Sequence, residues 1–233
     1  CTKLFNIFLL KMSKLNIILL SASLMALGAF SIDTILPSIS YLKNEFDVLP
    51  KNSHWIITSV FIGIAVGQFI FGPISDSIGR KKTAILGLII FSIGCILSIM
   101  SINYTMFLLT RFLQGLGSGA AVVISRAVAR DFFEGRKLAQ IMSIVTTIFI
   151  LVPVFAPSIG QIIISFFHWK MIFIFMLLLS IILKFFILYK YLEKKKLEIN
   201  LNFKATFDGF KEVYKSTISR TYTITAGLVF GIL

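Results

Sequence analysis

The chain has 233 residues, of which 57% are hydrophobic and only 14% are charged, and its mean hydropathy is +0.93. A soluble domain of this size could not remove so much apolar surface from water, so the composition excludes an ordinary soluble fold. The formal net charge of +13 would suit a nucleic-acid-binding protein. The basic residues lie between apolar runs instead of forming one patch, so we expect no nucleic-acid partner.

Six apolar runs are long enough to cross a bilayer, which requires about 20 residues. In chain order they are 15–42, 54–75, 83–102, 105–127, 139–167 and 169–190. A seventh begins near Thr221 and continues to Leu233. We therefore expect an all-α membrane protein with an N-terminal segment (1–14), a six-helix bundle (15–190), a loop (191–220) and the start of helix seven (221–233). The loop is predicted to be either an amphipathic helix on the membrane surface or a flexible linker.

The loops between the runs alternate in charge. Basic residues follow the second, fourth and sixth runs, whereas the loops after the first, third and fifth runs are close to neutral. Cytoplasmic loops are enriched in Lys and Arg, so this pattern predicts a cytoplasmic N-terminus and a cytoplasmic 191–220 loop. Two tryptophans at run ends, Trp55 and Trp169, are predicted to lie in the aromatic belt, and Lys184 is predicted to extend toward the inner surface.

Asp33 is the only acidic residue deep in an apolar run. A carboxylate at mid-membrane costs roughly 2.5–3.5 kcal/mol on insertion scales, so such a residue usually faces a polar cavity. Burial disfavours its charged form, and the group could therefore take up a proton. The alternative is a position of Asp33 near the outer interface.

The loop after the second run reads GPISDSIGRKK, from Gly72 to Lys82. Taken alone it is a basic hairpin in which a glycine allows a sharp turn. It resembles the signature loop between helices two and three of the major facilitator superfamily, and the matching positions are Gly72, Asp76, Gly79, Arg80 and Lys81. The resemblance implies that these residues control conformational change.

The fourth run contains Arg111, Gln114, Gly115 and Gly119. The two glycines form a GxxxG pair, which lets a second helix approach closely. The segment resembles the helix-four motif of the same superfamily, in which the arginine is implicated in proton coupling. The alternative for Arg111 is an interfacial side chain that extends to the membrane surface.

The fifth run contains Pro153, Ala156, Pro157 and Gly160, and its two prolines and its glycine are predicted to bend the helix. It resembles the antiporter motif on helix five of drug exporters. Gln161 departs from that motif, in which glycine is usual.

Asp33 and Pro37 resemble a pattern on helix one of bicyclomycin-resistance (Bcr/CflA) type exporters. The resemblance covers essentially the whole chain and implies the N-terminal half of a twelve-helix transporter that exchanges small amphipathic drugs for protons across a bacterial inner membrane. The implied partners are the drug, protons, the bilayer and the missing C-terminal half. No enzyme activity and no cofactor are implied, because the proton gradient supplies the energy. The alternatives are a non-transporting remnant or split-gene subunit of such a transporter, and a metabolite or nutrient transporter of the same fold.

Overall fold

The computed structural model describes residues 14–190, 211 and 214–232, and the regular secondary structure in these ranges is helical. The long helices are α2 (Lys14–Asp33), α4 (Trp55–Ile78), α5 (Arg80–Ile99), α6 (Tyr104–Phe132), α7 (Gly135–Phe166), α8 (Lys170–Lys190) and α10 (Thr217–Ile232). Six membrane spans result, because α2 continues through a 3-10 turn (Leu36–Ser38) into the short helix α3 (Ile39–Glu45) to form the first. The predicted all-α membrane fold with six spans and a further helix is confirmed.

The chain divides into two compact units, residues 1–198 and 199–233. The second unit contains α10, which begins at Thr217, four residues before the start predicted for helix seven. Most of the 191–220 segment, for which we predicted either an amphipathic helix or a linker, lies outside the described residues.

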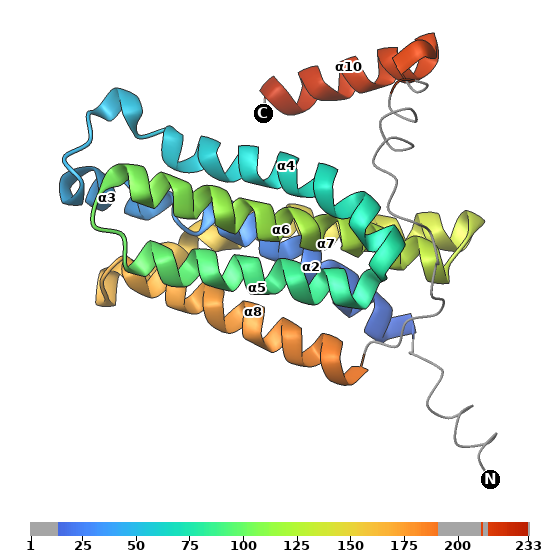
Figure 1. The fold of residues 1–233 in the computed structure, drawn as a ribbon, viewed down its shortest axis with the longest axis horizontal. Helices are drawn as coiled ribbons and strands as arrows, with labels where there is room; N and C mark the ends of the chain where they lie inside the picture. Colours follow the sequence, from blue (N-terminus) through green and yellow to red (C-terminus); the bar gives the residue numbers. More distant parts are fainter. Residues whose placement is uncertain (1–13, 191–210, 212–213, 233) are drawn as a thin grey trace. The chain divides into compact units, whose positions relative to one another are not determined.

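Helix α6 lies at the centre of the bundle, with its most extensive contacts to α4 and α5 and further contacts to α2 (Figure 1). It begins at a capped end, because the side chain of Asn103 accepts a hydrogen bond of 2.8 Å from the backbone N–H of Met106. Small residues dominate its middle, from Gly115 to Ala121, and allow neighbouring helices to approach closely. The central position of α6 therefore follows from its composition.

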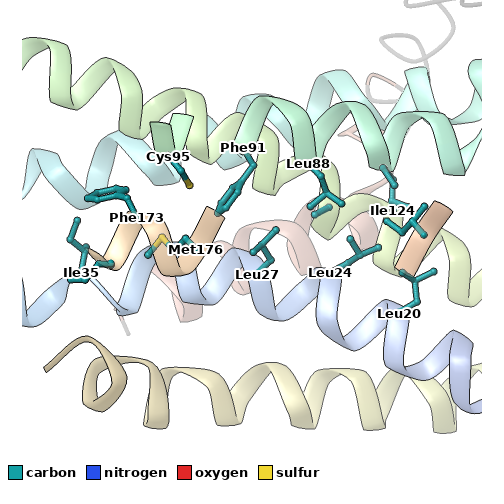
Figure 2. Close-up of a cluster of buried hydrophobic side chains, with 14 of the residues drawn as sticks. Leu20, Leu24, Leu27, Ile35, Leu88, Phe91, Cys95, Ile124, Phe173 and Met176 are labelled. Carbon is teal, nitrogen blue, oxygen red and sulfur yellow. The ribbon is translucent and has the colours of Figure 1, made fainter. Parts of the chain in front are cut away.

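The apolar core is shared by α2, α5, α6 and α8. Figure 2 shows Leu20, Leu24 and Leu27 of α2 opposite Leu88 and Phe91 of α5, together with side chains of α6 and α8. Lipid tails are as apolar as these side chains, so the bundle gains van der Waals packing from such contacts more than a reduction in water-exposed surface.

Candidate functional site

The first membrane span is broken at Asp33. Helix α2 ends there, a turn follows, and Pro37 lies inside the 3-10 turn that leads to α3. A helix end leaves backbone carbonyls without intrahelical partners, and inside a membrane these groups need other donors. The backbone N–H of Thr34 satisfies the Phe30 carbonyl at 3.3 Å. The Ser31 carbonyl receives its hydrogen bond from a different helix.

That donor is Arg111 of α6. Its Nη2 lies 2.6 Å from the Ser31 carbonyl oxygen, and its Nη1 donates to Oε1 of Gln114. The guanidinium carbon also lies 5.6 Å from the centroid of the Phe173 ring on α8. A cation near the C-terminus of a helix is stabilised by the helix dipole, and a cation over an aromatic face by the ring quadrupole. Arg111 thus joins α6 to α2 and α8 without an acidic partner in the part of the chain that the structure describes.

Arg111 is fully buried, with an exposed fraction of 0%. The alternative that its side chain extends to the membrane surface is therefore wrong. Its Nε has no hydrogen-bond partner among the described residues. The structure places a permanent positive charge inside the bundle, at the level where the first span breaks.

Gln114, also fully buried, extends this polar cluster toward α5 and α8. Its Oε1 accepts from Arg111, and its Nε2 lies 3.1 Å from both the Cys95 Sγ and the Met176 Sδ. Sulfur is a weak acceptor, so the amide is fixed mainly by its bond to the guanidinium. Gln114 therefore orients Arg111.

Asp33 lies two residues beyond the carbonyl that Arg111 binds. Its side chain is half-buried, and within the described ranges it has neither a hydrogen bond nor an ion pair. The structure brings Asp33 and Arg111 to the same break in α2 but does not join them as a salt bridge.

Helix α7 packs directly on this break. A Cβ atom at Gly160 would meet the Thr34 carbonyl oxygen, and the buried Ala156 packs in a cluster with Ala29 of α2. Helix α7 is continuous through Pro153 and Pro157 over its 32 residues. The helix-five motif thus places small residues, rather than reactive groups, against the end of α2.

Glycines on both helices form the contact between α4 and α6. A Cβ at Gly115 would meet the Val60 carbonyl oxygen, and a Cβ at Gly119 would meet that of Ile64. Gly63 and Gly67 of α4 are equally close to the backbone of α6, and our sequence analysis missed them. Their spacing of four residues is the signal that would have found them.

At the other end of these helices, Gly79 alone separates α4 from α5, with a φ of 97° that favours glycine. Arg80 forms an ion pair with Asp76, and its Nε lies 3.0 Å from Oδ2 of Asp131 on α6. Its side chain is only 11% exposed. We call this end of the bundle the Arg80 end.

Lys81, the next residue, donates to the Leu188 carbonyl of α8 at 3.1 Å. Gly72 has open space around it. The contacts of Arg80 and Lys81 therefore link α4, α5, α6 and α8. The sequence did not identify Asp131 as a partner of Arg80.

Two further expectations are wrong. Trp169 is only 4% exposed and packs against the rings of Phe46, Phe107 and Phe173 instead of lying in the aromatic belt. The side chain of Lys184 does not extend toward the Arg80 end.

The Lys184 Nζ instead donates to the Ser92 Oγ of α5 at 3.0 Å. Ser92 lies about three turns into α5 from Lys81, whereas Lys184 is about one turn from Leu188. The ammonium group therefore points toward the middle of the bundle.

Residues 18–233 match the Major Facilitator Superfamily. The chain belongs to this superfamily. It is a multi-pass membrane protein and a member of a family of transporters, not of enzymes.

Two relatives indicate a subgroup. The chain is 34% identical over 208 residues to a bicyclomycin resistance protein homolog of Haemophilus influenzae, covering 88% of this chain and 52% of the relative. It is 31% identical over 156 residues to the multidrug resistance protein MdtL of Vibrio parahaemolyticus, covering 67% and 39%. The chain thus spans about half the length of the first relative, and it corresponds to the N-terminal half of a superfamily transporter.

Among solved structures, the human organic anion transporter MFSD10 is similar, with a TM-score of 0.61. The match covers 81% of this chain and 50% of that one at 19% sequence identity. This likeness supports the fold alone.

Proposed function

We propose that the chain is the N-terminal part of an exporter that exchanges small amphipathic compounds for protons across a bacterial inner membrane, with its N-terminus on the cytoplasmic side. Relatives described as bicyclomycin and multidrug resistance proteins support the export of drugs. The alternating basic and neutral loops support the orientation. The second half of the protein would complete the binding cavity.

The observation that carries the proposal is the setting of Asp33. It is a half-buried carboxylate in a broken membrane span, and no cation within the described ranges pairs with it. An ionisable residue inside a membrane span is costly and is a functional candidate for that reason. Protonation would remove the charge, and a proton and a cationic compound would then compete for one carboxylate.

The residues around Asp33 have supporting roles in this proposal. Arg111 binds the carbonyl at the end of α2 and so fixes the position of the break. Gln114 orients Arg111, and Gly160 allows α7 to pack against Thr34. The ion pairs of Arg80 would hold α4, α5 and α6 together, so that these helices move as one body during transport.

The test is drug-driven proton release by the complete protein in detergent. Binding of a drug should release protons from the parent protein, and Asp33→Asn should abolish this release while neutral drugs still bind. Asp47→Asn is the matched control, since Asp47 is an exposed acid outside the long helices, and it should release protons normally. Undiminished release from Asp33→Asn would show that the proton site lies elsewhere.

A further inference from the structure

A cavity of about 390 Å³ lies at the end of the bundle opposite the Arg80 end, where α8 begins. Residues from α3, from the end of α7 and from the turn between α7 and α8 line it: Tyr41, Asn44, Glu45, Ile164, Phe167, His168 and Trp169. Its volume lies within the range of small-ligand pockets, roughly 300–1,000 Å³. Asp33 is not part of the lining, so this cavity is separate from the proposed proton site.

The charges of the lining favour a cation. Glu45 is its only acidic residue, no Lys or Arg contributes to it, and Glu45 has no ion pair with any residue that the structure describes. The rings of Tyr41, Phe167 and Trp169 share the cavity with this carboxylate. Aromatic faces attract cations, so the carboxylate and the rings favour the same kind of ligand.

Trp169 supplies two further observations. The Nζ of Lys170 lies 5.6 Å from the centroid of the indole ring, so this ring already has a cation of the protein beside it and Glu45 is the group left to attract the charge of a ligand. The indole Nε1 is buried and has no hydrogen-bond partner within the described ranges. A buried donor without an acceptor is costly, so a ligand whose acceptor atom reached this N–H would gain affinity.

We propose that this cavity is a second binding site, for a small organic cation that carries an aromatic body and a hydrogen-bond acceptor. The positive charge of the ligand faces Glu45, its aromatic body lies against Tyr41 and Phe167, and its acceptor receives the Trp169 N–H. The proposal goes beyond the exchange of drugs and protons at Asp33, and binding here requires no transport.

The probe is 1-benzyl-3-carbamoylpyridinium, which has all three features. Its binding to the complete protein is measured by equilibrium dialysis, in an Asp33→Asn background that removes the other carboxylate. The protein is held in nanodiscs made with phosphatidylglycerol. The headgroup of this lipid has no amine that could compete with the probe. We expect saturable binding that Glu45→Gln weakens at least tenfold, because an oppositely charged neighbour is lost. Glu45→Asp keeps the charge and should retain most of the affinity.

Asp47→Asn is the matched control, because Asp47 is an exposed acid two residues from Glu45 but is not in the lining. It should change the dissociation constant less than twofold. The probe without its carboxamide, 1-benzylpyridinium, should bind more weakly than the full probe to the parent protein. Trp169→Phe should remove that difference between the two probes.

Three results would overturn the proposal. The first is Glu45→Gln binding within twofold of the parent at an unchanged melting temperature. The second is an equal loss in Asp47→Asn, which would indicate a general surface-charge effect. The third is loss of probe binding in nanodiscs that contain phosphatidylethanolamine, which would show that the cavity holds a lipid headgroup instead of a soluble cation.

Discussion

The contact between α4 and α6 leaves no room for a side chain at Gly119. A Cβ there would lie against the Ile64 carbonyl oxygen and within 3.1 Å of both the Gln68 nitrogen and the Gly67 Cα, and real Cβ atoms essentially never approach closer than 3.0 Å. Gly119→Ala must therefore push the two backbones apart. Overpacking of this kind costs about 1–3 kcal/mol. Alanine also favours the helix over glycine, which offsets roughly 0.5–1 kcal/mol of this destabilisation.

Gly72 of α4 is the matched control. Apart from its chain neighbours, nothing lies within 4 Å of a Cβ built on it. Pro73 follows it inside α4 and disfavours the helical conformation for a residue that has a Cβ, so Gly72→Ala should change the free energy of unfolding by less than about 1 kcal/mol. The two alanine variants should differ by roughly 1–3 kcal/mol in the free energy of unfolding. For a chain of this size, 1 kcal/mol shifts the melting temperature by about 2–4 °C. Their melting temperatures should therefore differ by roughly 2–12 °C.

The assay is thermal unfolding in one detergent, followed by circular dichroism, with the parent protein measured alongside. Gly119→Ala should melt below both the parent and Gly72→Ala. If Gly119→Ala melts at or above Gly72→Ala, the backbones of α4 and α6 are not in the close contact that the structure shows.

Three further predictions concern orientation and the two arginine clusters. A reporter fused after Lys82 should be cytoplasmic and one fused after Lys51 periplasmic; a cytoplasmic reporter at Lys51 would contradict the orientation. Asp131→Asn should lower the free energy of unfolding by about 1 kcal/mol, because it removes the ion pair between α6 and the largely buried Arg80; an unchanged melting temperature would show that the pair contributes nothing. Arg111→Lys keeps the charge but not the planar fork, so the variant should lose one charged hydrogen bond, about 1.5–3 kcal/mol; melting that matches the parent would refute this role.

The sequence predicted those parts of the structure that the bilayer imposes. A span needs about 20 apolar residues with its backbone groups satisfied, so the runs identified the six spans directly. The sharp turn at Gly79 could also be predicted, because glycine adopts positive φ at little cost.

The partners of the charged residues could not be predicted from the sequence. Arg111 binds a carbonyl 80 residues earlier in the chain, and Arg80 binds a carboxylate 51 residues later. Such pairs depend on how the helices pack against one another. The spacing of residues along a single helix carries no information about that packing. Lys184 was misplaced for the same reason, because its partner Ser92 lies on another helix.

Asp33 and Arg111 are both candidates for proton coupling, and the structure suggests why they would function better apart. A buried cation needs groups that compensate its charge, and the nearest acid would be the obvious one. Arg111 instead binds the carbonyl at the C-terminal end of α2, a glutamine and an aromatic face, all of which are neutral. A carboxylate in a tight ion pair is a poor proton acceptor, because the neighbouring cation stabilises its charged form. By breaking α2 at Asp33, the chain gives Arg111 a partner in the backbone. In the proposed exporter, this arrangement would leave the carboxylate available for proton exchange at the same level of the membrane.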